Sequence, residues 1–296
     1  MKKTIFTGAA VAIVTPMNDD FSVNYEKLGE LIDFQINNGT DAIVICGTTG
    51  ESATLTHEEH TKAIDYTVKK VAGRVPVIAG TGSNDTRYAV ELSLEAQKSG
   101  ADALLLVTPY YNKTTQAGLV RHFTYIADRV NLPMIVYNVP SRTGLDIKPE
   151  TYYELSKHPN IVAAKEANGN ITSVAKTASL CGDNLDIYSG SDELIVPILS
   201  LGGKGVISVL SNIMPRETHE ICAKFFSGDV EGSKKLQLDC MSLIEALFCE
   251  TNPIPVKEAL NLMGFGVGNC RMPLCRMQEK NIAVLKEELK KHNLIS

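Results

Sequence analysis

Short, nearly continuous apolar segments recur eight times in this chain, and amphipathic segments of helical length lie between them. The apolar segments are rich in Val, Ile, Leu and Ala, and they cover residues 9–14, 41–46, 75–79, 103–107, 133–137, 161–165, 185–189 and 205–209. Continuous apolar runs of this length are typical of parallel strands that are covered on both faces. We therefore expect eight parallel strands.

The segments between these runs place apolar residues at helical spacing, as Leu28, Leu31 and Ile32 do within residues 25–37. Glycines follow several of these segments where a helix C-cap belongs, at positions 39, 100 and 228. Strands that alternate with helices indicate βαβ units. Eight units of this length fit an α/β fold of the TIM (β/α)8 barrel type, and a doubly wound open sheet is the alternative.

The barrel is expected to occupy residues 1–226, and the remaining residues, 227–296, form a C-terminal extension. Three further helices are expected in this extension, over residues 230–248, 255–263 and 277–291. No segment of flexible composition separates them from the barrel, so we expect the extension to pack on it.

The composition agrees with a cytoplasmic protein. Of 296 residues, 44% are hydrophobic and 21% charged, and the net charge of −5 provides no basic surface for nucleic acid or anionic membrane. No apolar run has the length of a membrane-spanning helix. Residues 1–14 resemble a signal peptide but lack a small-residue cleavage site, so we interpret them as the first strand. The seven cysteines include no C-x-x-C pair, which indicates core residues in a reducing compartment.

Polar residues follow the apolar runs, and in a TIM barrel these positions form the carboxyl rim that carries the active site. The polar segments are Thr15-Pro16, Gly47 to Glu51, Gly80 to Asn84, Thr108 to Asn112, Tyr137 to Gly144, Lys165-Glu166, Ser189 to Asp192 and Ser211-Asn212. The opposite ends of the strands show little comparable polarity. This asymmetry predicts a site at the carboxyl rim.

Lys165 ends the apolar run 161–165 and is the candidate nucleophile. Burying an ammonium group is costly, so burial lowers the pKa of lysine. A lysine that is partly neutral near pH 7 attacks carbonyl carbons and forms a Schiff base. The alternative is a structural lysine that extends its ammonium to solvent.

Three other groups on the rim suit chemistry on a keto acid. Tyr137 ends the preceding strand, so its phenol can reach the Lys165 nitrogen and transfer protons; the alternative is a packed core tyrosine. The turn from Gly47 to Gly50 offers N–H groups and two hydroxyls to a carboxylate, although it can equally be a plain turn. Arg142 is a partner for a second carboxylate, or else a solvated arginine.

Three other patterns do not predict sites. His57 and His60 lie three residues apart on a helix but do not form an H-E-x-x-H metal motif. The segment 202–205 is rich in glycine but precedes its strand and so lies at the wrong rim. No G-x-G-x-x-G follows a strand, so no dinucleotide cofactor is expected.

Together these residues resemble the pyruvate-dependent class I aldolases of the dihydrodipicolinate synthase and N-acetylneuraminate lyase superfamily, over nearly the whole chain. The motifs that carry the resemblance are Gly47-Thr48-Thr49-Gly50-Glu51-Ser52, Thr108-Pro109-Tyr110-Tyr111-Asn112, Tyr137-Asn138-Val139-Pro140-Ser141-Arg142-Thr143-Gly144, Lys165-Glu166-Ala167, Ser189-Gly190-Ser191-Asp192 and Asn252-Pro253-Ile254-Pro255-Val256-Lys257. The Ser141-Arg142-Thr143-Gly144 segment is similar to the synthase branch, where the arginine holds the carboxylate of aspartate 4-semialdehyde.

The resemblance implies a synthase that condenses pyruvate with L-aspartate 4-semialdehyde to give 4-hydroxy-tetrahydrodipicolinate, the first committed step of the diaminopimelate route to lysine. It implies that Lys165 forms the pyruvate imine, with a proton relay of Tyr137, Thr48 and Tyr111. Substrate would be held by Thr49, Arg142, Gly190 and the backbone at Ile207. Tyr111 would reach a neighbouring subunit of a homotetramer built as a dimer of dimers. No metal and no separate cofactor are implied.

The resemblance also implies a lysine-binding regulatory site at the dimer interface. The corresponding residues here are Ser52, Ala53, His57, His60, Asn84, Tyr88 and Tyr110. Tyr88 departs from the regulated pattern, which has a glutamate there, so we expect lysine to inhibit weakly or not at all. Two other functions stay open: a sister aldolase acting on sialic acid or a 2-keto-3-deoxy sugar acid, and a non-catalytic pyruvate-binding protein.

Overall fold

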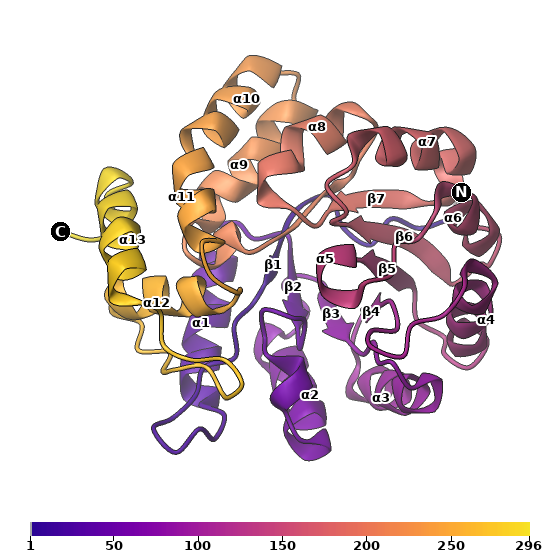
Figure 1. Ribbon diagram of the computed structural model, residues 1–296, viewed down its shortest axis with the longest axis horizontal. Coiled ribbons are helices and arrows are strands. Elements are labelled where there is room, and N and C mark those ends of the chain that lie inside the picture. The colour runs from indigo at the N-terminus through magenta and orange to yellow at the C-terminus, as the bar shows by residue number, and fades with distance from the viewer. Residues whose placement is uncertain (1) are drawn as a thin grey trace.

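The computed structural model describes residues 2–296 and contains a closed barrel of eight parallel strands (Figure 1). The strands are β1 (Gly8–Ala12), β2 (Ala42–Ile45), β3 (Val77–Gly80), β4 (Ala103–Val107), β5 (Met134–Asn138), β6 (Ile161–Glu166), β7 (Asp186–Ser189) and β8 (Gly205–Ser208). They follow one another in chain order, and β8 pairs with β1. The expected TIM barrel is confirmed, and the open sheet is excluded.

Helices surround the barrel, as βαβ connections require. They are α1 (Tyr25–Asn37), α2 (His57–Val71), α3 (Thr86–Ser99), α4 (Gln116–Ala127), α5 (Pro140–Thr143), α6 (Pro149–Leu155), α7 (Ile171–Cys181), α8 (Ile195–Ser200) and α9 (Pro215–Phe226). The α2 helix begins with a capping box formed by Thr56 and Glu59. Gly100 ends α3 at a φ of 88° in the left-handed region, as the sequence predicted.

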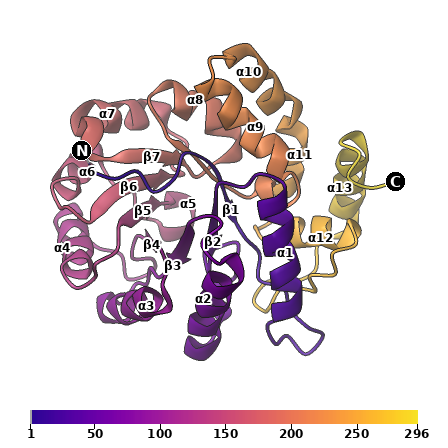
Figure 2. The same ribbon diagram turned by 180° about the vertical axis from the view of Figure 1, so that it is seen from behind.

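The alternation of side chains along each strand divides the core into two layers. One layer fills the barrel interior and includes Val44, Ile135 and Ile207; the other lies between strands and helices. The amino end of the barrel is closed by the N-terminal segment, which crosses it on the way to β1 (Figure 2). There Phe6 stacks on Tyr188 with ring centroids 4.3 Å apart. The interior is therefore closed at this end and accessible from the carboxyl rim.

The C-terminal extension contains α10 (Val230–Asp239), α11 (Met241–Leu247), α12 (Ile254–Leu262) and α13 (Glu279–Lys291). The single helix expected over residues 230–248 is wrong, because it is interrupted at Cys240, which ends α10 and precedes α11. The break lets α10 pack on α9 while α11 packs on α13. Among residues 2–296, no helix is both long and apolar enough to cross a membrane.

Candidate active site

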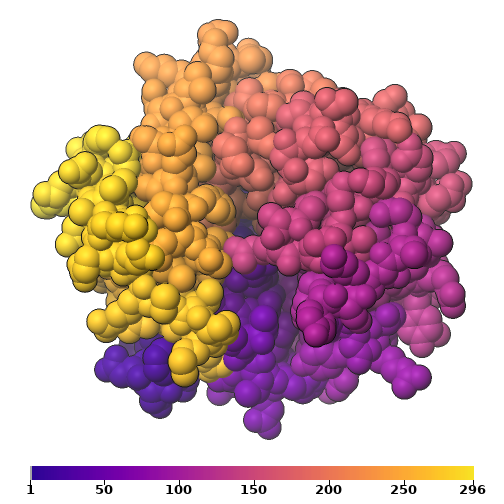
Figure 3. Space-filling view, viewed as in Figure 1, coloured from indigo at the N-terminus to yellow at the C-terminus, as the bar shows by residue number. Residues whose placement is uncertain are grey.

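A cavity of about 510 Å³ lies at the carboxyl ends of the strands, where the polar asymmetry of the sequence predicted a site. In the space-filling view a hollow separates the orange atoms of the C-terminal region from the magenta atoms of the middle of the chain (Figure 3). Six of the predicted site residues line the cavity: Thr48, Thr49, Tyr137, Arg142, Lys165 and Gly190. Residues of α11 and Asn252 line it as well, so the extension forms part of its wall.

Lys165 lies on β6 beside Tyr137 of β5, in the register that pairs these two residues. Its side chain is 6% exposed, and its Nζ lies 4.2 Å from the centroid of the Tyr137 ring. Burial lowers the pKa of Lys165 from its ordinary 10.5 to about 7; the Asp192 carboxylate opposes this shift and the Arg142 charge adds to it. About half of the Lys165 side chains are therefore neutral at pH 7, as a nucleophile requires.

Tyr137 is buried beside the lysine, and burial raises the pKa of its phenol to about 12. The Arg142 charge and the Thr48 hydroxyl act in the opposite direction. The phenol is therefore protonated near neutral pH, and it can donate a proton to an oxygen or nitrogen bound next to Lys165.

Gly190 follows β7 and leaves room for the lysine. A Cβ at this position would lie 3.2 Å from Lys165 Cε and 3.1 Å from the Glu166 carbonyl oxygen. It would also lie 2.9 Å from Ala167 Cβ, so a larger residue here would crowd both Ala167 and Lys165.

The turn from Gly47 to Gly50 follows β2 and carries Thr48 and Thr49 into the cavity. Contacts from both sides hold this turn. The Thr15 hydroxyl donates to the Gly50 carbonyl at 2.7 Å, and the Asn252 side-chain amide donates to the Thr49 hydroxyl at 3.0 Å. The turn offers N–H groups and hydroxyls, the donors that suit a carboxylate.

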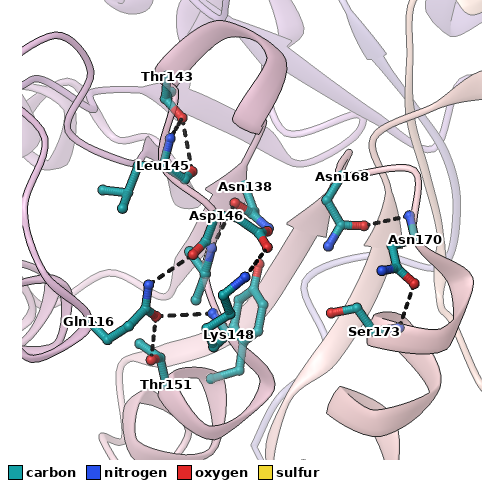
Figure 4. Close-up of polar contacts among 12 residues, drawn as sticks. Gln116, Asn138, Thr143, Leu145, Asp146, Lys148, Thr151, Asn168, Asn170 and Ser173 are labelled. Carbon is teal, nitrogen blue, oxygen red and sulfur yellow. Dashed lines mark hydrogen bonds and ion pairs between the residues drawn. The ribbon is translucent and has the colours of Figure 1, made fainter.

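Arg142 lies on the short helix α5, and its guanidinium donates to the Asn252 carbonyl at 3.0 Å. The segment after α5 is anchored by Asn138, whose side-chain amide donates to Asp146 at 2.8 Å and whose side-chain oxygen accepts from the Ile147 N–H at 3.1 Å. Gln116 of α4 donates to the Asp146 carbonyl at 2.9 Å (Figure 4). These bonds place the arginine at the cavity mouth.

Glu166 is a buried carboxyl group next to Lys165 that the sequence argument gave no role. It accepts hydrogen bonds from the Asn138 side chain at 3.0 Å, the Tyr152 hydroxyl at 3.0 Å and the Asn168 N–H at 2.9 Å. Burial raises its pKa to about 7. Strand alternation was the available signal, since Asn138 and Glu166 directly follow Tyr137 and Lys165 and so point out of the barrel.

Two predicted site residues do not line the cavity. Tyr111 follows β4 at the rim with a φ of 67°, and its side chain is 92% exposed. Ile207 lies within β8, and its side chain is fully buried in the barrel interior. Within one chain, Tyr111 is therefore directed to the outside.

The seven residues of the expected lysine site come from four segments. Ser52 and Ala53 lie in the 3-10 turn before α2, His57 and His60 in α2, Asn84 and Tyr88 just before and within α3, and Tyr110 in the loop after β4. The His57 and Tyr88 rings are 5.9 Å apart, and His60 Nε2 lies 2.7 Å from the Gly80 carbonyl oxygen. Glu91, one turn after Tyr88, places a carboxylate oxygen 3.9 Å from His57 Nε2. A carboxylate thus lies near the position where the regulated pattern has its glutamate.

The comparisons with known proteins agree with this geometry. The model of the dihydrodipicolinate synthetase family matches residues 5–292. The chain belongs to this family. A 4-hydroxy-tetrahydrodipicolinate synthase of Lachnoclostridium phytofermentans is 62% identical over 98% of the chain and 99% of that protein.

Solved structures of family members have the same fold. The dihydrodipicolinate synthase of Aquifex aeolicus has a TM-score of 0.95 and 46% identity, covering 98% of this chain and 99% of that one. The enzyme of Cyanidioschyzon merolae, solved with lysine bound, has a TM-score of 0.96 and 40% identity, covering 99% and 100%. The chain is an enzyme of this family.

Proposed function

We propose that this enzyme condenses pyruvate with L-aspartate 4-semialdehyde to give 4-hydroxy-tetrahydrodipicolinate, the first committed step of the diaminopimelate route to lysine. The observation that carries the proposal is Lys165, a buried lysine with a pKa of about 7 that shares its cavity with Arg142. The names of the relatives support the same reaction.

The reaction begins when Lys165 Nζ attacks C2 of pyruvate. The resulting carbinolamine takes up a proton on its hydroxyl and loses water, which leaves a protonated imine. Tyr137, whose ring centroid lies 4.2 Å from Lys165 Nζ, would donate the proton, and its relay would include Thr48 and Tyr111. The Gly47–Gly50 turn, Thr49 above all, would hold the pyruvate carboxylate, and the Ile207 backbone and Gly190 would also contact the substrate.

The imine then acts as an electron sink. Loss of a proton from C3 gives an enamine, and C3 attacks the aldehyde carbon of the semialdehyde while the aldehyde oxygen takes up a proton. The semialdehyde nitrogen attacks C2, the ring closes, and Lys165 leaves as the free amine. Arg142 binds the semialdehyde carboxylate throughout.

Borohydride trapping tests this chemistry. Borohydride with pyruvate should inactivate the enzyme and leave the reduced adduct on the peptide that contains Lys165. An adduct on Lys204 or Lys257 would contradict the assignment. Assays of sialic acid and 2-keto-3-deoxy sugar acid cleavage, beside semialdehyde condensation, distinguish this function from that of a sister aldolase. Turnover of any of these substrates excludes a pyruvate-binding protein without activity.

Tyr111 would act in the site of a neighbouring subunit, because its side chain is 92% exposed and does not line the cavity of its own chain. This requires a homo-oligomer, for which we propose a homotetramer. Tyr111→Phe and Lys165→Ala should each be inactive alone and should recover part of the activity when their subunits exchange. Mixed oligomers that form without recovering activity would remove Tyr111 from the relay.

A further inference from the structure

The motif from Asn252 to Lys257 has no part in the chemistry above, but it lies against the site. Lys257 of α12 is 1% exposed, and its ammonium donates to three acceptors: the Glu51 carboxylate at 2.8 Å, the Thr15 carbonyl at 3.1 Å and the Asn269 carbonyl at 2.8 Å. An ammonium has three N–H groups. The hydrogen-bonding capacity of this buried lysine is therefore filled.

Glu51 lies at the other end of this ion pair and directly follows the Gly47–Gly50 turn. Its side chain is buried, and its second carboxylate oxygen accepts from the Arg271 N–H at 2.8 Å. Its backbone holds a φ of 54° in the left-handed region, which is uncommon for a residue other than glycine. The pair thus joins the turn to the segment that follows β1 and to two segments of the C-terminal extension.

A buried ion pair contributes little net stability, because desolvating two charges offsets their attraction. An apolar pair of similar volume would hold the extension on the barrel at least as well. The hydrogen bonds of this ion pair have fixed directions, which apolar contacts lack. They therefore hold the turn at one position relative to β1. The choice of charges here therefore points to positioning.

A second contact from the extension supports the same role. Asn252 donates from its side chain to the Thr49 hydroxyl and accepts on its carbonyl from Arg142. The extension thus contacts both groups that hold substrate carboxylates in the proposed reaction, and Lys257 lies in the helix that begins two residues later.

We propose that Lys257 and Glu51 are positioning residues, whose ion pair holds the Gly47–Gly50 turn where Thr48 and Thr49 meet the pyruvate carboxylate. The inference rests on the proposed function. It assigns to the C-terminal extension a part in pyruvate binding that the chemistry of Lys165 does not require.

The test uses the full chain with Lys257→Met, Glu51→Gln and the double variant. Each is compared with wild type for the pyruvate concentration that gives half-maximal borohydride inactivation, and for its melting temperature. The double variant leaves no unpaired charge, so its melting temperature should recover relative to Lys257→Met. Its half-maximal pyruvate concentration should remain about tenfold or more above wild type, because a displaced turn binds the carboxylate poorly. If the pair were only structural, the melting temperature and the half-maximal pyruvate concentration of the double variant would both return towards the wild-type values.

The matched control is the exposed pair Lys69–Asp65 on α2, whose charged atoms are 2.7 Å apart, against 2.8 Å in the buried pair. The double variant Lys69→Met with Asp65→Asn should have the same half-maximal pyruvate concentration as wild type. If the half-maximal pyruvate concentration of the Lys257→Met, Glu51→Gln double variant is within twofold of wild type, the positioning role is wrong. It is also wrong if all three variants fail to fold, because the pair is then a requirement for folding. Absence of a wild-type adduct on Lys165 would instead overturn the proposed function.

Discussion

Lys165 and Lys257 are both lysines removed from solvent near the carboxyl rim, 6% and 1% exposed, but their ammonium groups meet different surroundings. Lys257 donates to a carboxylate and two carbonyls. Lys165 faces the Tyr137 ring, and none of the ion pairs within residues 2–296 includes it. Burial by itself does not make a lysine reactive. What matters is whether the protein supplies acceptors for the charge.

Removing the reactive lysine should have the largest effect. Lys165→Met should lower the condensation rate on the order of 10⁴-fold or more, because Lys165 is the one lysine among the described residues that line the cavity. Steady-state rates and borohydride trapping measure this. Lys204→Met is the control and should behave as wild type. A Lys165→Met enzyme that still traps pyruvate would transfer the role to another lysine.

Removing the acceptor of the paired lysine should affect stability first. Glu51→Ala leaves the Lys257 charge buried without its carboxylate, which should lower the free energy of unfolding by about 3–5 kcal/mol. Urea denaturation measures the change. Asp65→Ala, which removes the acceptor of the exposed Lys69, should cost less than about 1 kcal/mol. Equal losses in the two variants would mean that burial does not distinguish these pairs.

Arg142 is expected to serve only the second substrate. Arg142→Ala should reduce kcat/KM for the semialdehyde roughly tenfold to more than a hundredfold. This corresponds to about 1.5–3 kcal/mol, the contribution of one charge-assisted contact. Pyruvate trapping on Lys165 should be harmed far less, since Arg142 contributes only a minor part of the lowered pKa of Lys165. Arg142→Lys keeps the charge but loses the planar pair of donors. Its kcat/KM for the semialdehyde should lie between those of wild type and Arg142→Ala. Equal damage to both substrates would make Arg142 structural.

The pKa of Lys165 sets a pH dependence. With a pKa of about 7, the neutral fraction rises from about a tenth at pH 6 to about nine tenths at pH 8. The rate of pyruvate trapping should therefore rise roughly tenfold over this range and then level off. The Asp192 carboxylate raises the pKa of Lys165, so Asp192→Asn should move the profile to lower pH. A flat profile would contradict a reactive neutral lysine.

We expect lysine to inhibit the enzyme only weakly, and this is the smallest of the predicted effects. Tyr88 removes a charge-assisted contact worth about 1.5–3 kcal/mol and offers a cation–π contact of about 0.5–2 kcal/mol instead. Tyr88→Glu should lower the inhibitory lysine concentration about tenfold. Strong inhibition of the wild type at sub-millimolar lysine would contradict this. Glu91, close to His57, would then be the first carboxylate to replace.

Much of the fold followed from local patterns. The eight apolar runs predicted the eight strands, and the polar residues after them predicted the rim on which Thr48, Tyr137, Arg142 and Lys165 meet. The break at Cys240 could not be predicted in this way, because both halves of the segment are amphipathic and the change of direction depends on what each half packs against.

The sequence by itself determined the barrel and the rim position of Lys165, because alternation and strand ends are properties of neighbouring residues. Only the tertiary structure decided which buried lysine finds acceptors for its ammonium group. The three acceptors of Lys257 come from positions 15, 51 and 269, and Tyr137 and Gly190, which lie against Lys165, are also distant from it in the chain. Solvation of a charge depends on all the groups around it, and those groups meet only when the chain has folded.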